Sequence, residues 1–358
     1  MAKNKVVIAG ALGLVGRGAV EHFDTLDDWE VIGLSRRNPD FETGASFLSV
    51  DLTDRKATED ALGDLTGITH AVYAALYEKP QLAAGWSAQD QIDTNVGMFK
   101  NFLDALIAAN PGFEHLTLLQ GTKAYGVHTG PIRIPSRERD PRIMSPGFYY
   151  GQEDYMAARQ KGADWTWTIF RPQMVCGIAV GTQLSVMAGL GVFAAISREL
   201  GLPLRFPGRN DGLLEAVDNI LIAKAMAWAA TDPRCANQIY NLTNGDVMVW
   251  QNLLPKIAKL FGMDSAEAHP VLLKDAMRDK APVWEAIVEK YGLLKYDMDY
   301  LVGSWDAVDL FLDYGVRDHP ALVSTIKARK HGFPECEDSE DMFIRMLTEM
   351  QDRKLLPK

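Results

Sequence analysis

Short apolar runs alternate with segments of helical periodicity through the first half of this 358-residue chain. Several of the runs are apolar without interruption, as expected of parallel strands that are covered on both faces. This alternation predicts an α/β fold built on a Rossmann-type doubly wound parallel sheet. The predicted strands are Lys5–Ala9, Trp29–Leu34, Ser46–Val50, Ala71–Ala75, Leu116–Gln120, Thr166–Phe170 and Ile239–Thr243, and the helices between them include Leu14–Phe23, Arg55–Leu62 and Gln91–Ala109.

The pattern changes after Pro172, where helical segments begin to dominate. A chain of this length exceeds what one core usually organises, so a second lobe is expected. We predict a Rossmann domain at 1–176, to which about 209–245 return, and a smaller, mainly helical C-terminal lobe formed by 177–208 and 246–358. The helices predicted after Pro172 are Ser185–Leu200, Asn219–Ala230, Trp250–Phe261, Ala281–Tyr291, Ser304–Leu312 and Asp338–Met350.

A glycine-rich turn follows the first predicted strand and opens the first predicted helix. Its spacing, GxxGxxG, is typical of short-chain dehydrogenases. Glycines let the backbone approach a pyrophosphate closely, and the free N–H groups and the dipole of a helix N-terminus favour an anion. The position of the turn favours a dinucleotide site over an ordinary glycine turn. The expected cofactor contacts here are Gly10, Leu12, Gly13, Leu14, Val15 and Gly16.

The end of the second predicted strand indicates which dinucleotide binds. An NAD enzyme usually carries Asp or Glu there, which holds the ribose 2′-hydroxyl. Here Ser35, Arg36 and Arg37 follow the strand without an acid. A guanidinium group can hold the additional 2′-phosphate, so we predict NADPH; a pair of solvated arginines is the alternative. Further cofactor contacts are expected at Asp51, Leu52, Ala74, Ala75, Gln120, Gly121, Pro172 and Val175.

The catalytic motif of a short-chain dehydrogenase is incomplete in this chain. Most extended members have Ser or Thr where Gly121 stands, and they pair it with a YxxxK motif on the next helix. Tyr150 aligns with the tyrosine of that motif, but Asp154 occupies the lysine position. A lysine returns at Lys123, just after the fifth strand. The alternatives are a surface position for Lys123 and a packing role for one of the adjacent tyrosines, Tyr149 and Tyr150.

These departures resemble the progesterone 5β-reductase and iridoid synthase family, a group of atypical extended short-chain dehydrogenases. The resemblance rests on Gly121-x-Lys-x-Tyr125 and on Phe148-Tyr-Tyr-x-x-Glu-Asp154, with further similar stretches at Phe170-Arg-Pro172 and at 241–247. It spans nearly the whole chain. It implies an NADPH-dependent reductase of carbon–carbon double bonds conjugated to a carbonyl group, with the helical lobe binding substrate.

The resemblance also implies roles for individual residues. Tyr150 would donate a hydrogen bond to the developing enolate oxygen, and Lys123 would support it electrostatically. A donor and an ammonium group placed in advance lower the barrier, because negative charge accumulates on one oxygen. The expected substrate is a small, apolar conjugated carbonyl compound. Its expected contacts are Leu76, where family members often carry Trp, Ile132, where they carry Phe, and Tyr125 and Tyr149.

Two other functions remain open. The same site could reduce the carbonyl group of an aldehyde or ketone, since Tyr150 could protonate an alkoxide. A cofactor-sensing binding protein with an inert site is the alternative from another class, and the presence of both Lys123 and Tyr150 argues against it.

Composition narrows the range of partners. The formal net charge is −10, from 37 basic and 47 acidic residues, without a basic stripe, which argues against nucleic acid. Three widely spaced cysteines favour a reducing compartment, and the longest apolar run is too short to span a bilayer, so we expect a cytoplasmic protein. The seven histidines show no metal-binding spacing, and no metal is expected. A homodimer through helices near 91–109 and 150–161 and a monomer are equally compatible with the pattern.

Overall fold

The computed structural model describes residues 4–79, 85–208, 212–312 and 320–358. The chain divides into two compact units. The first consists of Met1–Gln173, Asn219–Leu242 and Val323–Glu335, and the second of Met174–Asp218, Thr243–Leu322 and Cys336–Lys358. The first unit carries the large sheet, and the second is mainly helical. The segment Val323–Glu335, which the sequence pattern places in the helical lobe, belongs to the first unit.

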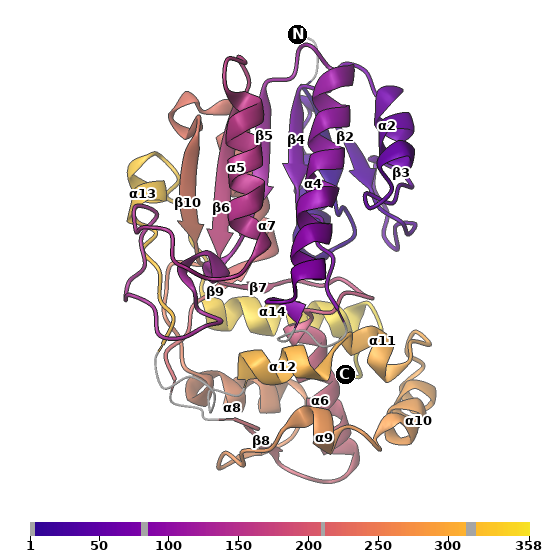
Figure 1. The fold of residues 1–358 in the computed structure, drawn as a ribbon. Coiled ribbons are helices and arrows are strands. Elements are labelled where there is room, and N and C mark those ends of the chain that lie inside the picture. The colour runs from indigo at the N-terminus through magenta and orange to yellow at the C-terminus, as the bar shows by residue number, and fades with distance from the viewer. Residues whose placement is uncertain (1–3, 80–84, 209–211, 313–319) are drawn as a thin grey trace. The chain divides into compact units, whose positions relative to one another are not determined.

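A seven-stranded parallel sheet is the centre of the first unit (Figure 1). Neighbouring strands pair in parallel at their carboxyl ends: Ala9 pairs with Leu34 on one side and with Tyr73 on the other. Across the sheet the strands are β10 (Gln238–Leu242), β6 (Thr166–Pro172), β5 (His115–Leu119), β4 (His70–Tyr73), β1 (Asn4–Ala9), β2 (Trp29–Leu34) and β3 (Ser46–Leu48). The strands β1, β2, β4 and β6 are largely buried, as their continuous apolar runs predict.

Helices cover both faces of this sheet (Figure 1). The helices α2, α4 and α5 lie in front of it in this view and α7 lies behind, where α1 packs against α7. The face under α4 is held by aromatic packing, because the rings of Phe99 and Phe102 contact Tyr73 of β4. The helices of this unit are α1 (Leu14–Phe23), α2 (Arg55–Gly63), α4 (Gln89–Ala109), η1 (Thr122–Tyr125), α5 (Phe148–Gln160), α7 (Asn219–Thr231), η2 (Pro233–Cys235) and α13 (Ile326–Lys330).

The strand order reverses at β1, since β2 and β3 extend the sheet on one side and β4, β5, β6 and β10 on the other. In an open parallel sheet, ligands bind outside the carboxyl ends of the strands at this reversal. The turns after β1, β4 and β5 all lie at that edge. They contain the glycine-rich turn, the loop that holds Glu78 and the helical turn of Lys123.

The second unit has a core of its own. Trp250 stacks on Phe206 and contacts Phe343 edge to face, and all three side chains are fully buried. Two short parallel strand pairs accompany the helices: β7 (Met174–Cys176) with β9 (Ala216–Asp218), and β8 (Leu204–Arg205) with β11 (Ser265–Ala266). The helices are α6 (Val186–Glu199), α8 (Trp250–Leu260), α9 (Leu273–Ala276), α10 (Ala281–Tyr291), α11 (Met298–Val302), α12 (Trp305–Leu312) and α14 (Ser339–Asp352).

Candidate active site

The turn after β1 fits a bound pyrophosphate. Gly10 has a φ of +78°, and a Cβ atom there would lie 2.7 Å from the backbone nitrogen of Ala75. A Cβ atom at Gly16 would collide with the carbonyl group of Gly10, so only glycine allows the turn to close this tightly. The N-cap of α1, Gly13, makes no side-chain cap hydrogen bond, and the first turn carries no acid. The N–H groups of that turn therefore remain available for an anion.

The predicted 2′-phosphate residues lie at the end of β2, beside this turn. The backbone N–H of Arg37 donates to Ser35 Oγ at 3.1 Å, and its guanidinium group donates to the carbonyl oxygen of Leu12 at 3.2 Å. Arg36 is exposed. Its charge also contributes to a lowered pKa of Asp51, although hydrogen bonds from Thr53 are the larger cause. Two exposed guanidinium groups next to the glycine turn fit the phosphate-rich end of NADPH.

Gln120 and Pro172, two further predicted cofactor contacts, support the end of β5. The side chain of Gln120 accepts from Arg171 Nε at 3.1 Å and donates to the carbonyl oxygen of Tyr149 at 3.3 Å. Pro172 ends β6, and its carbonyl oxygen lies 3.6 Å from the position of a Cβ atom at Gly121. Leu52 is buried and Asp51 exposed just after β3. Val175 belongs to β7 of the second unit.

Lys123 is enclosed rather than exposed at the surface. Its side chain is only 20% exposed, and Nζ lies 3.8 Å from a carboxylate oxygen of Glu78. The ammonium group is 4.0 Å from the ring centroid of Trp86 and 6.0 Å from those of Phe148 and Tyr149. Burial lowers the pKa of Lys123 to about 8, against the opposing effect of Glu78. The surface alternative for this lysine is therefore excluded in this structure.

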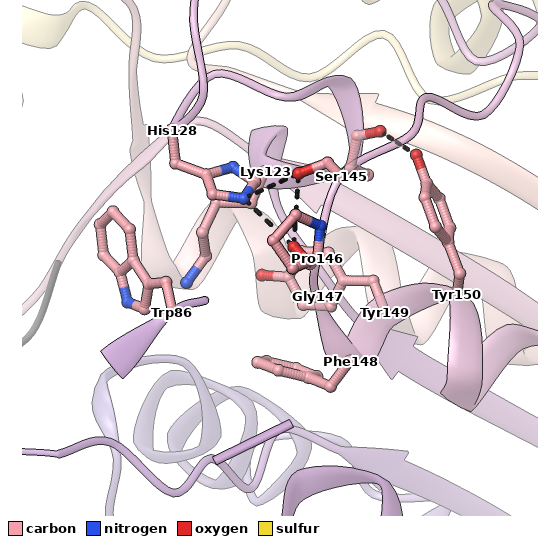
Figure 2. Close-up of a pocket in the computed structure, with 10 residues that line it drawn as sticks. Trp86, Lys123, His128, Ser145, Pro146, Gly147, Phe148, Tyr149 and Tyr150 are labelled. Atoms are coloured by element: carbon pink, nitrogen blue, oxygen red, sulfur yellow. Dashed lines mark hydrogen bonds between the residues drawn. The ribbon is translucent and has the colours of Figure 1, made fainter. Parts of the chain in front are cut away.

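The two adjacent tyrosines of α5 point to different places (Figure 2). Tyr150 donates from its hydroxyl to the carbonyl oxygen of Ala124 at 2.6 Å and accepts from the N–H of Ile143 at 3.2 Å. The guanidinium group of Arg142 covers its ring at 4.8 Å. Figure 2 shows its hydroxyl turned away from Lys123, whereas the ring of Tyr149 extends towards that ammonium group.

Tyr149 occupies the position opposite the missing serine. Its hydroxyl oxygen lies 3.3 Å from where a Cβ atom at Gly121 would be. No other residue in the described part of the chain forms a hydrogen bond with that hydroxyl. Burial, with a smaller contribution from the charge of Glu78, raises its pKa, so the phenol stays protonated at neutral pH. Tyr149 thus has a free O–H donor in the pocket, and Tyr150 does not.

Counted from Tyr149, the lysine position of the YxxxK motif is Glu153. Its carboxylate lies between two guanidinium groups, that of Arg171 at 2.8 Å and that of Arg142 at 2.6 Å. Asp154, the acid at the position counted from Tyr150, pairs with the other nitrogen of Arg142 at 2.6 Å. Both acids anchor α5 to its surroundings through these ion pairs.

The pocket around Lys123 contains only part of the predicted substrate site. Tyr149 lines it, but Tyr125 is buried elsewhere and donates to Asn241 Oδ1 at 2.6 Å, which ties η1 to β10. Leu76 is 39% exposed, and Ile132 is partly buried; neither is among the described residues that line the pocket. The lining residues are Trp86, Lys123, Ala124, His128, Ser145, Pro146, Gly147, Phe148, Tyr149 and Tyr150.

Comparison with known proteins identifies the family. The family model for the PRISE-like Rossmann-fold domain matches residues 51–314. The chain belongs to this PRISE-like family. Among the relatives of this PRISE-like chain, the (S)-8-oxocitronellyl enol synthase of Nepeta racemosa is 32% identical, over 98% of this chain and 92% of that protein. The 3-oxo-Delta(4,5)-steroid 5-beta-reductase of Arabidopsis thaliana is 31% identical over the same shares. The resemblance inferred from the sequence motifs is confirmed.

Solved structures confirm the fold of the PRISE-like chain. The UDP-glucose 4-epimerase of Thermotoga maritima superposes with a TM-score of 0.68 at 14% identity, over 97% of this chain and 99% of that one. The UDP-glucose 4-epimerase of Thermus thermophilus, solved with NAD, gives 0.65 at 18% identity, over 97% and 99%. Within the described ranges, no helix is long and apolar enough to cross a membrane, and no group of three His, Cys, Asp or Glu side chains is arranged to hold a metal ion.

Proposed function

We propose that this chain reduces a carbon–carbon double bond conjugated to a carbonyl group, with NADPH as the hydride donor. The observation that carries the proposal is the enclosed Lys123 ammonium group beside the free hydroxyl of Tyr149, at the carboxyl edge of the sheet. Membership of the PRISE-like family supports it, as do relatives named as a steroid 5-beta-reductase and as an enol synthase.

The residues of the glycine turn and of the β2 end would hold the cofactor. The N–H groups at the start of α1 would bind the pyrophosphate, and Arg36 and Arg37 the 2′-phosphate. The backbone at Ala74, Ala75 and Gly121 would border the rest of the dinucleotide. NADPH, when bound, supplies the hydride that is added to the β-carbon of the substrate.

The protein's part in the chemical step is to stabilise the negative charge that develops on the carbonyl oxygen. Tyr149 donates its O–H to this oxygen, and the Lys123 ammonium group lowers the energy of the charge from a short distance. The sequence motif favours Tyr150 as the donor, but the hydroxyl of Tyr150 is already hydrogen-bonded to Ala124 and Ile143. We therefore assign the donor to Tyr149, and Tyr150 to the support of η1.

The pocket favours an apolar substrate with a single polar end. The rings of Trp86, Phe148 and Tyr149 surround the ammonium group, so a hydrocarbon skeleton meets aromatic surface and its carbonyl oxygen meets the cation. The carbonyl-reducing alternative would use the same groups, because an alkoxide oxygen can occupy the same place as an enolate oxygen.

Product identification separates these reactions. The purified protein is incubated with NADPH and a panel of conjugated aldehydes and ketones, and the products are analysed by mass spectrometry. The saturated carbonyl compound is expected, and an allylic alcohol would instead support carbonyl reduction. Binding of NADPH without turnover of either kind would support the cofactor-sensing alternative.

Location and assembly extend this proposal. A cytoplasmic location agrees with the three cysteines, Cys176, Cys235 and Cys336, all of which are free thiols in the structure. A homodimer through α4 and α5 and a monomer remain the two options for assembly. Light scattering on the eluate of a size-exclusion column distinguishes a mass of 39.6 kDa from twice that value.

A further inference from the structure

The carboxylate of Glu78 faces the ammonium group of Lys123, although the sequence gives it no role. Its side chain is 7% exposed, and one of its oxygens lies 3.8 Å from Lys123 Nζ. The same carboxylate accepts from the indole N–H of Trp86 at 3.1 Å and from the side-chain amide of Gln91 at 3.2 Å. Burial raises the pKa of Glu78, and the charge of Lys123 and the hydrogen bonds from Gln91 and Trp86 oppose that shift, as the partners of a buried charge should.

The loop that holds Glu78 is pinned to α4 on both sides of this residue. The side chain of Asn95 accepts from the N–H of Tyr77 and donates to its carbonyl oxygen, both at 2.9 Å. Gln91 accepts from the N–H of Lys79 at 3.1 Å, while its amide nitrogen donates to Glu78. Gln91 and Asn95 are themselves buried. The position of the carboxylate is therefore set by the backbone of the loop and not only by attraction to Lys123.

We propose that Glu78 is a positioning residue, whose buried carboxylate fixes the Lys123 ammonium group beside Tyr149 and maintains its positive charge during turnover. This inference rests on the proposed function, in which that charge stabilises the oxygen of the substrate. Trp86 completes the arrangement: its N–H donates to Glu78 while the face of its ring covers Lys123 at 4.0 Å.

The separation of the pair matters for catalysis. At 3.8 Å the carboxylate attracts the ammonium group without a direct hydrogen bond, and that ammonium group forms no hydrogen bond with any described residue. Its three N–H donors thus remain available to a substrate oxygen or to bound water. Glu78 maintains the charge of Lys123 without occupying the groups that the reaction uses.

The environment of Lys123 makes a charge partner necessary. Burial alone favours the neutral amine, and the pKa of Lys123 is lowered to about 8 even with Glu78 present. The titratable groups around it are Glu78 from the loop after β4, Tyr149 and Tyr150 from α5, and His128 from the loop after η1. Glu78 is the one carboxylate among these four, so its removal should move the titration of Lys123 to lower pH.

A chemical titration of Lys123 tests the pairing without cofactor or substrate. Acetic anhydride acylates the neutral amine only, and peptide mass spectrometry measures the modification of Lys123 at each pH. The wild-type midpoint is expected at about 8. In Glu78→Gln it should fall by roughly one unit, and in Glu78→Asp it should be intermediate, since the shorter acid retains the charge at a greater distance. Glu59→Gln, the same change at an exposed position of α2, should leave the midpoint in place.

The pH profile of kcat tests the consequence for turnover. As pH rises through the pKa of Lys123 the ammonium form is lost, so the alkaline limb should move to lower pH in Glu78→Gln. Activity should be largely retained at pH 6 and roughly fivefold below wild type at pH 8, a recovery on acidification that a merely misfolded pocket would not show. If Glu78→Gln does not fold, the Glu78→Asp variant alone tests the inference. A small downward shift of its alkaline limb supports the inference, and no shift overturns it.

The two measurements separate the inference from the proposed function. An unchanged acylation midpoint in a folded Glu78 variant overturns the inference, whatever the enzyme reduces. A lowered midpoint in a protein that reduces no conjugated carbonyl compound supports the pairing of Glu78 with Lys123 and refutes the proposed reaction.

Discussion

The hydroxyl oxygen of Tyr149 lies 3.3 Å from the position that a Cβ atom would take at Gly121. In most extended short-chain dehydrogenases a Ser or Thr stands at the position of Gly121, and its hydroxyl pairs with the tyrosine. Here the glycine leaves the tyrosine without that partner, and the ammonium group of Lys123 lies 6.0 Å from the tyrosine ring. In this site the ammonium group of Lys123 lies near Tyr149, where most extended short-chain dehydrogenases have a Ser or Thr hydroxyl beside the tyrosine.

The Gly121→Ala variant tests whether the space opposite Tyr149 is needed. The φ of Gly121 is −178°, an extended conformation that alanine adopts without strain, so the fold should be retained. A methyl group at 3.3 Å is a tight contact, which would displace the hydroxyl by a few tenths of an ångström. We expect kcat to fall about tenfold with a change in melting temperature of less than about 3 °C. A wild-type kcat would show that the hydroxyl does not act from this place.

The Tyr149→Phe and Tyr150→Phe variants distinguish the two candidate donors. Tyr149→Phe should lower kcat by about 10²-fold with little change in the dissociation constant of NADPH, because it removes a donor used only in the chemical step. Tyr150→Phe should cost about 1 kcal/mol of unfolding free energy, since it removes hydrogen bonds to Ala124 and Ile143, and retain most of kcat. The reverse result would restore Tyr150 as the donor, as the motif alignment favours.

Long, strongly patterned elements could be predicted from the sequence. Trp29–Leu34, Leu14–Phe23 and Ala281–Tyr291 have the predicted bounds. The apolar pattern of these segments is long enough to define their type and their ends. The pairings of β7 with β9 and of β8 with β11 were not predicted, because strands of two or three residues have no periodicity to detect. They arise from contacts between segments that are distant in sequence.

Residues of the site could be predicted from the sequence only where they belong to a motif within one helix, strand or turn. The position of Lys123 after a strand and a glycine marks it as a site residue, but the motif does not decide between Tyr149 and Tyr150 as the donor. An acid follows each tyrosine four residues later, and adjacent helical residues point about 100° apart. Glu78 and Trp86 belong to no sequence motif, and only their contacts with Lys123 reveal a role.

The Arg36→Glu variant tests the assignment of the cofactor. A carboxylate at the end of β2 would repel a 2′-phosphate but could accept a hydrogen bond from a ribose 2′-hydroxyl. We expect KM for NADPH to rise about 100-fold and KM for NADH to change by less than about threefold. Lys259→Glu, an exposed charge reversal in α8, controls for net charge and should change neither value. An unaltered preference for NADPH would show that Arg36 does not bind the 2′-phosphate, and Arg37 would then be the remaining cationic candidate.

A buried histidine should make the fold sensitive to acid. His115 is the first residue of β5 and is 3% exposed, its Nδ1 lies 2.8 Å from Thr166 Oγ1, and its Nε2 has no partner among the described residues. Burial lowers its pKa to about 3, with a smaller effect from His70. The folded state therefore holds it neutral, while the unfolded chain binds a proton below about pH 6.5.

The sign of the effect follows from the direction of this shift. Stability is full above pH 6.5 and is lost as pH falls towards 3, because only the unfolded state binds the proton in that window. Urea unfolding should show a loss of about 2 kcal/mol between pH 7 and pH 5 from this residue. His115→Asn, which keeps a polar atom near Thr166 and cannot titrate, should flatten this dependence, whereas the exposed His269→Asn should not. An equally steep loss in both variants would assign the acid sensitivity to other groups.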